Sequence, residues 1–237
     1  TCGFEKDAFY FYKSVWNQKE KFAYLCPHWN LKLKKGTVLP VICYTNCEDA
    51  ELFVNGRSFG MKSKGFPCYG MTERYGHFDR YRRPANTEDL FLSWDVPYEP
   101  GKIEVVGYHD GKEVCRYNVE TTGEAAAIKL TVDKTSVDAD GRSVVQAEVR
   151  ILDSEGHLVF DACPELNFTL EGDGEIIGID NGDPACHEQW KETKGRHAFN
   201  GMAYAVIRAG QNKGELKLTV TSSDNTLTNA SVTIQVG

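Results

Sequence analysis

Carboxylates, tryptophans and clusters of metal-binding donors are the groups in this sequence that could act on a ligand. The chain has 34 Asp and Glu residues, but none stands in a recognisable catalytic pair. The expected pattern of strands and turns also contains no βαβ alternation, no phosphate loop and no strand-to-helix nucleophile elbow. We therefore predict no catalytic residue and no cofactor for this chain.

Sugar-binding sites stack the sugar ring on an exposed aromatic side chain flanked by a few polar groups. Trp190 lies in a polar stretch and is the best candidate for such stacking, with local packing as the alternative. Trp29, beside His28, is a candidate for a domain interface, for a core position or for a ligand-facing position. The other two tryptophans, Trp16 and Trp94, are predicted to be packed in cores.

A metal site has little support in the sequence. Asp180, Asn181 and Asp183 cluster oxygen atoms that are weak candidates for calcium, but Asn-Gly and Gly-Asp are also ordinary turn residues. The six histidines show no His-x-x-x-His pair, and no Cys-x-x-Cys motif occurs among the eight cysteines. We expect no bound metal and mostly free thiols, while one or two disulfides remain an alternative.

The charge balance limits the classes of partner. The net charge is −7, from 27 basic and 34 acidic residues, and the basic run at Arg80, Arg82 and Arg83 is short. Because nucleic-acid binding needs clustered Lys and Arg, we predict no nucleic-acid partner. No apolar run approaches the roughly 20 residues that span a bilayer.

One helix is expected, at residues 3–16, before a chain that otherwise reads as strands. Its aromatic and aliphatic residues fall at helical spacing, and acidic residues lie in its first turn, where the helix dipole favours them. A single helix cannot bury such a stripe by itself. Together with a first residue that is not Met, this predicts that the chain is a piece of a larger protein.

Short strands and turns fill the rest of the chain. In the first half they are expected at residues 22–26, 38–44, 50–54, 57–60, 91–96, 102–109 and 113–121. Asn55-Gly56 predicts a type I′ hairpin turn, and residues 61–89 are expected to form a long irregular loop. After a linker at 122–126, strands are expected at 128–132, 145–151, 166–170, 175–179, 202–208, 215–221 and 231–236. About seven strands in each half predict a mainly β chain of two consecutive immunoglobulin-like β-sandwiches preceded by one N-terminal helix.

Several segments, in the same order, resemble glycoside hydrolase family 2, and especially β-galactosidase-like enzymes of Bacteroidetes. Residues 44–60, with the hairpin AELFVNGRSFG, and residues 92–111 resemble the immunoglobulin-like domain that follows the catalytic barrel. Residues 3–16 resemble the last helix of that (β/α)8 barrel, and residues 22–30 the segment leading into the sandwich. Residues 178–183 and 198–201 resemble a C-terminal accessory domain of the same enzymes.

The resemblance implies three parts: a remnant of the last barrel helix at 1–21, an immunoglobulin-like sandwich at 22–122 and a second immunoglobulin-like or invasin-like sandwich at 123–237. Family members are retaining glycosidases, which place two carboxylates about 5–5.5 Å apart. Such carboxylates come from the strands of a barrel, and this chain has none, so the resemblance implies a non-catalytic part of a hydrolase.

The expected partners are the catalytic barrel of the same polypeptide, a glycan and a second copy of the chain. By the same resemblance the protein is expected to be periplasmic or secreted. A free carbohydrate-binding module and an immunoglobulin-like adhesion or scaffold segment are the alternative functions. If residues 3–16 are a barrel helix, then Phe4, Phe11, Tyr12 and Trp16 should be exposed here, or covered by residues 22–32, by the first sandwich or by a second copy.

Overall fold

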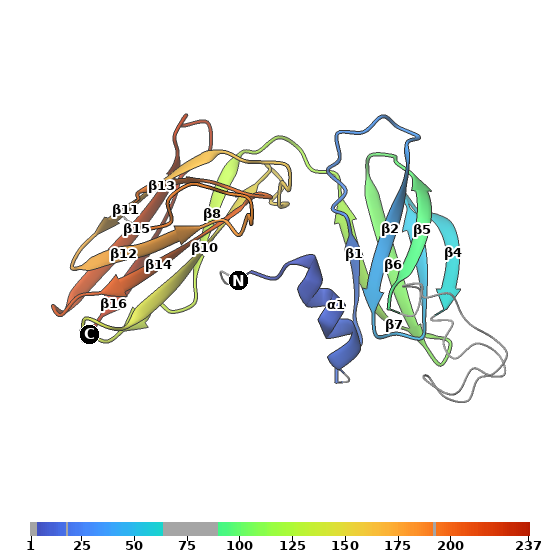
Figure 1. The fold of residues 1–237 in the computed structure, drawn as a ribbon, viewed down its shortest axis with the longest axis horizontal. Helices are drawn as coiled ribbons and strands as arrows, with labels where there is room; N and C mark the ends of the chain where they lie inside the picture. Colours follow the sequence, from blue (N-terminus) through green and yellow to red (C-terminus); the bar gives the residue numbers. More distant parts are fainter. Residues whose placement is uncertain (1–3, 18, 64–89, 192) are drawn as a thin grey trace. The chain divides into compact units, whose positions relative to one another are not determined.

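The computed structural model describes residues 4–17, 19–63, 90–191 and 193–237 (Figure 1). Within them the chain is mainly β, with one helix and several antiparallel sheets, as the sequence predicts. Residues 5–121 and residues 122–237 belong to two separate compact units. In the part of the chain described, no helix has the length and apolar character needed to cross a bilayer.

Among its described residues, the first unit has one helix and seven strands: α1 (Asp7–Trp16), β1 (Ala23–Cys26), β2 (Val38–Thr45), β3 (Asp49–Val54), β4 (Arg57–Ser63), β5 (Leu92–Pro97), β6 (Lys102–His109) and β7 (Lys112–Glu120). One sheet has the order β1-β2-β5 and the other β4-β3-β6-β7, with all neighbours antiparallel. Alternate residues of β3, Ala50, Leu52 and Val54, are buried, which gives this strand one face in the core.

The predicted hairpin joins β3 to β4. Asn55 and Gly56 have φ angles of 49° and 80°, as a type I′ turn requires at both central positions. The letters Gly-x-Ser-x-Gly at 56–60 fall inside this hairpin, so they do not form a nucleophile elbow, which needs a strand-to-helix turn. The prediction of an irregular loop from residue 61 is wrong at its start, because β4 continues to Ser63. Residues 64–89, with the basic run and Cys68, lie outside the described residues.

The described part of the second unit forms nine strands: β8 (Ala127–Val132), β9 (Ser136–Val137), β10 (Val144–Leu152), β11 (Glu165–Glu171), β12 (Gly174–Asp180), β13 (Gly195–His197), β14 (Met202–Ala209), β15 (Gly214–Ser222) and β16 (Ala230–Val236). They form one sheet of order β12-β14-β10-β8 and one of order β13-β11-β15-β16-β9. Strands β9 and β13 were not predicted, because two or three residues are too few to show a period-2 pattern.

The core of the second unit lies between its two sheets. Leu216, Leu218 and Val220 of β15 are buried, while the residues between them are exposed or half-buried. Strand β12 is an edge strand with an irregular register between Ile176 and Gly178, which marks a β-bulge at Ile177. This edge carries the candidate site described below.

Helix α1 packs with one face on the first sandwich, beside β1 in Figure 1. The ring of Tyr10 stacks on Tyr24 with centroids 3.7 Å apart, and the ring of Phe11 meets Tyr44 edge-on at 5.6 Å. The helix begins at Asp7, later than predicted. The described residues 4–6 precede it, and the first turn closes with the Phe9 N–H donating to the carbonyl of Lys6 at 2.8 Å.

The opposite face of α1 is open and aromatic. Phe9, Tyr12 and Trp16 are 45%, 50% and 73% exposed, whereas Phe4 is buried and Phe11 half-buried. The prediction that Trp16 is a core residue is therefore wrong for this chain. The other expectation is that these side chains are exposed or covered by the first sandwich. Tyr12 and Trp16 are exposed, and Phe11 packs on the first sandwich.

Candidate functional site

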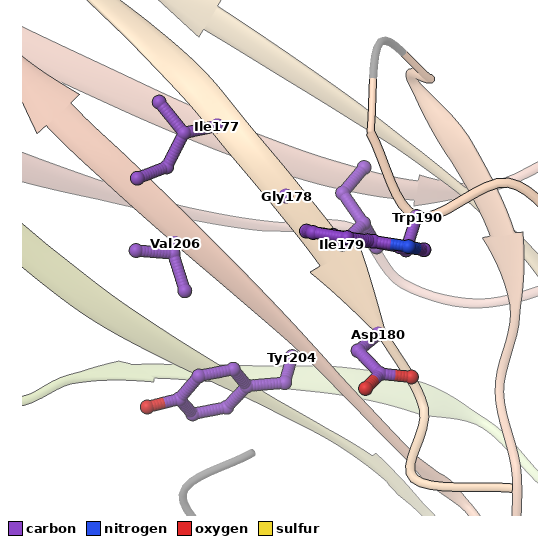
Figure 2. Close-up of a pocket in the computed structure, with 7 residues that line it drawn as sticks. All are labelled: Ile177, Gly178, Ile179, Asp180, Trp190, Tyr204 and Val206. Atoms are coloured by element: carbon purple, nitrogen blue, oxygen red, sulfur yellow. The ribbon is translucent and has the colours of Figure 1, made fainter. Parts of the chain in front are cut away.

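A pocket of about 240 Å³ lies at the edge of the second unit, on strands β12 and β14 and the loop after β12. Its lining residues are Ile177, Gly178, Ile179, Asp180, Trp190, Tyr204 and Val206. In Figure 2, Ile177, Val206 and Tyr204 form one side of this space, and Trp190 and Asp180 lie on the other. The pocket thus combines two aromatic rings and aliphatic groups with one carboxylate.

Trp190 is held against the edge strand although it is 55% exposed. The Ile179 N–H donates to the carbonyl of Trp190 at 2.8 Å, so Trp190 adds one backbone hydrogen bond to the edge strand β12. The indole lies on Gly178, where an added Cβ would be 3.5 Å from the ring atom Cε3. The ammonium of Lys191 lies 4.5 Å from the ring centroid and does not line the pocket.

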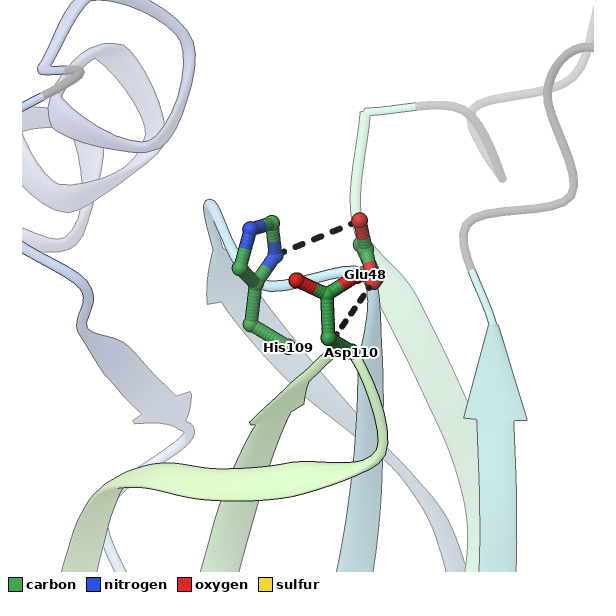
Figure 3. Close-up of side chains that lie close together, drawn as sticks. All are labelled: Glu48, His109 and Asp110. Carbon is green, nitrogen blue, oxygen red and sulfur yellow. Dashed lines mark hydrogen bonds and ion pairs between the residues drawn. The ribbon is translucent and has the colours of Figure 1, made fainter.

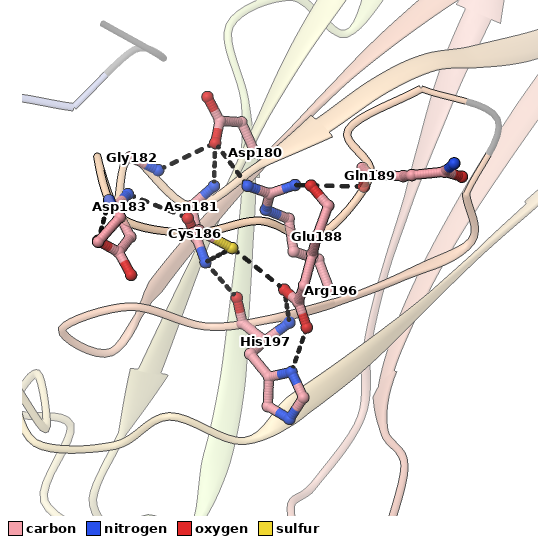
Figure 4. Close-up of polar contacts among 10 residues, drawn as sticks. Asp180, Asn181, Gly182, Asp183, Cys186, Glu188, Gln189, Arg196 and His197 are labelled. Atoms are coloured by element: carbon pink, nitrogen blue, oxygen red, sulfur yellow. Dashed lines mark hydrogen bonds and ion pairs between the residues drawn. The ribbon is translucent and has the colours of Figure 1, made fainter.

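Arg196 anchors the loop that carries Trp190. Its side chain is only 4% exposed, although it comes from the short strand β13 (Figure 4). Nη1 donates to the carbonyls of Glu188 and Gln189 at 3.0 and 3.2 Å, and Nη2 lies 3.3 Å from Oδ1 of Asp180. A buried cation thereby joins the loop backbone to the carboxylate that lines the pocket.

A second set of contacts closes the same loop on β13. The Glu188 carboxylate accepts the His197 N–H at 3.2 Å and pairs with the His197 ring. This bond to the ring of His197 lowers the pKa of Glu188 and outweighs the opposing effect of burial. Asn181 Nδ2 donates to the His197 carbonyl at 2.9 Å. Together with Arg196, these bonds tie both ends of the loop to the strand below it.

The cluster Asp180, Asn181 and Asp183 forms the turn that the sequence offered as the alternative to calcium. Asp180 Oδ1 accepts the N–H groups of Asn181 and Gly182 at 2.7 and 3.2 Å. Asn181 Oδ1 accepts the N–H of Asp183 at 3.0 Å, and Asp183 Oδ1 accepts the N–H of Ala185 at 2.9 Å. Their carboxylate and amide oxygens thus act on backbone N–H groups, as in other Asx turns.

Trp29 and His28, the other residues predicted to bind carbohydrate, belong to the first unit. Trp29 is 1% exposed, and its Nε1 donates to the carbonyl of Glu99 at 2.9 Å. The interpretation of Trp29 as an interface or sugar-stacking residue is therefore wrong, because its ring is in the core of the sandwich with no face left for a ligand. His28 Nδ1 accepts the N–H of Asn30 at 3.3 Å, a local turn contact. Trp94, predicted as core, is 3% exposed.

Glu48, His109 and Asp110 form a cluster that the sequence did not predict, because 61 residues separate the first member from the second (109 − 48). Their ligand atoms lie within 4.8 Å of one another (Figure 3). Glu48 accepts the Asp110 N–H at 3.0 Å and faces His109 Nδ1 at 3.2 Å. Asp110, with φ of 50°, begins the turn between β6 and β7, so these contacts hold that turn to the residue before β3.

The six cysteines among the described residues carry free thiols: Cys26, Cys43, Cys47, Cys115, Cys163 and Cys186. Cys47 and Cys115 lie side by side above Gly107, with their sulfur atoms 3.5 Å apart. The hydrogen bond between them and their burial raise the pKa of the Cys115 thiol. A thiol with a raised pKa is a poor nucleophile, so this pair has the character of packed side chains rather than of a reactive centre.

Both units match known protein families. Residues 128–233 match the family described as "Glycoside hydrolase family 2 C-terminal domain 5", and residues 36–115 match a domain of unknown function, DUF4982. This chain belongs to the C-terminal region of glycoside hydrolase family 2. The resemblance noted in its sequence is thereby confirmed.

Individual relatives agree with this assignment. The glycoside hydrolase family 2 chain is 37% identical over 222 residues to β-galactosidase BoGH2A of Bacteroides ovatus, covering 93% of this chain and 23% of that protein. It is 30% identical over 169 residues to a β-glucuronidase of Formosa agariphila, covering 70% of this chain and 15% of the relative. A β-glycosidase structure from Bacteroides vulgatus superposes with a TM-score of 0.82 at 30% identity, covering 99% of this chain and 27% of that one. The chain thus spans about a quarter or less of the length of these relatives.

Sequence reasoning found Trp190 but missed the residues that position it. Arg196 and Gly178 follow no motif, and their partners lie 7 to 16 residues away or on another strand. No strand was predicted at residues 195–197, and the burial of Arg196 depends on how the loop folds back onto that strand.

Proposed function

We propose that this chain is the non-catalytic C-terminal part of a retaining family 2 glycosidase and supports the catalytic (β/α)8 barrel of the same polypeptide. Three findings support the proposal: the family match, the small share of each relative that the chain covers, and the exposed aromatic face of α1. Its relatives carry both β-galactosidase and β-glucuronidase names, so the proposal names no single substrate for the complete protein.

The exposed face of α1 is the observation that carries the proposal. Phe9, Tyr12 and Trp16 are spaced three and four residues apart, which places them in one stripe along the helix. The rings of Tyr12 and Trp16 stack on each other with centroids 4.9 Å apart. An aromatic side chain buries about 150–250 Å² when it is covered, so a stripe of three is large for a bare surface. We propose that the catalytic barrel of the same polypeptide covers this stripe.

The test compares Trp16→Ala in the complete polypeptide with the same change in the isolated chain. In the complete polypeptide the substitution should lower the free energy of unfolding by about 2–4 kcal/mol, the cost of removing a buried aromatic anchor. In the isolated chain the effect should stay within about 0.5 kcal/mol, as for other exposed positions. Val38→Ala, at a position that is 63% exposed and outside the stripe, is the matched control.

Three outcomes would contradict the proposal. Equal, small effects of Trp16→Ala in both forms would mean that no barrel covers the stripe. Turnover of an aryl β-galactoside or β-glucuronide by the pure chain would show that the chain is itself catalytic. Association of the isolated chain into dimers that Trp16→Ala abolishes would instead assign the stripe to a second copy.

A further inference from the structure

We infer that the pocket beside Trp190 binds the ring of a neutral hexopyranose, and that the second unit thereby holds a glycan near the rest of the protein. The inference deepens the proposed function by adding a ligand to it, and it rests on that proposal for the idea that glycans are what the polypeptide meets.

The walls of the pocket suit a sugar ring. A hexopyranose has an apolar side formed by its C–H groups, and this side packs on aromatic rings. Trp190 supplies the exposed ring, and the largely buried Tyr204 and the aliphatic Val206 line the space beside it (Figure 2). Gly178 adds no side chain to the space next to the indole. A cavity lined mainly by apolar groups with few polar ones is the usual form of a small-ligand site.

Asp180 supplies the polar contact. Its carboxylate lies at the rim of the pocket and can accept hydrogen bonds from sugar hydroxyl groups. The carboxylate is oriented by Nη2 of Arg196 at 3.3 Å and by the Asn181 N–H at 2.7 Å. A fixed acceptor beside an aromatic wall favours one orientation of the ring over others.

The loop is organised before any ligand arrives. Arg196, 96% buried, holds the two carbonyls that precede Trp190, and the Trp190 carbonyl is bonded to β12. Binding then orders few additional groups, which removes a main cost of association. An exposed tryptophan whose backbone is tied at three successive residues has the form of a built platform.

The charge of Asp180 selects the ligand class. Arg196 pairs with this carboxylate but its side chain is only 4% exposed, whereas that of Asp180 is 42% exposed, so the charge that a ligand meets at the rim is negative. A uronic acid would bring a second carboxylate to the same rim, and like charges at short range repel. A neutral hexose brings only hydroxyl groups, which donate to the carboxylate. The pocket therefore distinguishes sugars that differ only in whether C6 carries a hydroxyl or a carboxylate.

The experiment titrates the chain with methyl β-D-galactopyranoside and with the corresponding galacturonide, and follows indole fluorescence together with saturation-transfer NMR of the sugar. The neutral sugar should bind with a Kd of about 1 mM, the weak range of single sugar contacts, and the uronide at least about tenfold more weakly. Trp190→Ala should weaken binding of the neutral sugar at least about tenfold. Val114→Ala, at an exposed apolar position of the first unit, should leave it unchanged.

Each contrary result has a defined meaning. Absence of binding at about 50 mM of the neutral sugar, far above the expected Kd, would overturn the site. Binding that Trp190→Ala leaves intact would overturn its location, and tighter binding of the uronide would overturn the ligand class. A circular dichroism spectrum identical to wild type excludes misfolding of the variant. None of these results would alter the outcome of the Trp16 experiment, so failure of the sugar site and failure of the proposed function can be told apart.

Discussion

Replacing Arg196 by alanine should release the loop that carries Trp190. The guanidinium is almost fully buried and bridges the carbonyls of Glu188 and Gln189 to the carboxylate of Asp180. Alanine removes all three contacts and leaves a void where the side chain lay. We therefore expect both a loss of stability and a gain in local motion of the loop.

The size of the effect follows from the exposure of each partner. Hydrogen bonds from a charged donor contribute about 1.5–3 kcal/mol each, but the residues of the two carbonyls are exposed, so water replaces part of the loss. The Asp180 carboxylate is 42% exposed, which makes its ion pair with Arg196 a minor contribution. Two such bonds, each near the lower end of this range, and a small void together predict that the free energy of unfolding falls by about 2–4 kcal/mol.

Urea unfolding followed by far-UV circular dichroism measures this loss. Arg208→Ala is the matched control, because Arg208 lies on β14 of the same unit, is 47% exposed and pairs with Glu175 at 2.6 Å. An exposed pair of this kind contributes about 0–1 kcal/mol. Hydrogen exchange read by mass spectrometry should show faster exchange in peptides that cover residues 186–197 and no change in peptides from residues 23–54.

Equal shifts of the urea midpoint in Arg196→Ala and Arg208→Ala would contradict this role of Arg196. Exchange at residues 186–197 that is no faster in Arg196→Ala than in wild type would contradict it as well. Either result would mean that the other contacts of the loop, such as those of Glu188 and Asn181 with His197, hold it without a contribution from the buried cation.

Three further predictions concern the sandwiches. Gly101→Ala should lower the free energy of unfolding by about 1–3 kcal/mol, because φ is 130° at this position and the new Cβ would collide with Oδ1 of Asn55. A change of less than about 1 °C in the midpoint of thermal unfolding would contradict this. Cys163, which is exposed, should react with iodoacetamide at pH 8 at least about tenfold faster than Cys26, whose pKa burial raises to about 12; equal rates by mass spectrometry would contradict it. Burial tends to raise the pKa of Asp153, but hydrogen bonds from backbone N–H groups lower it overall. The ionised carboxylate therefore stabilises the fold at pH values above its unfolded pKa of about 4, and this contribution is lost as the pH falls further. Wild type should therefore be more stable than Asp153→Asn at pH 7, with the gap closing by about pH 2; a gap that does not change with pH would contradict this.

Most elements of the fold could be predicted because their signals are local. Alternation of apolar residues in β15 and the Asn55-Gly56 turn each depend on neighbours within a few positions. The ends of the predicted strands differ from the observed ones by at most one residue, except at β4, which runs on to Ser63. The short β13 was not predicted, since it exists only through its pairing with β11.

The apolar faces of the helix and strands can be read from the amino-acid sequence, since periods of 3.6 and 2 are properties of the chain alone. Which of those faces meet a neighbour depends on how the segments pack in three dimensions. Trp29 and Trp190 both stand next to polar residues, yet one is in a core and the other on a pocket rim. The stripe of α1 likewise splits into a packed face and an open one, because the first sandwich can cover only one side of a helix. Burial depends on contacts between segments far apart in sequence, and local spacing does not encode them.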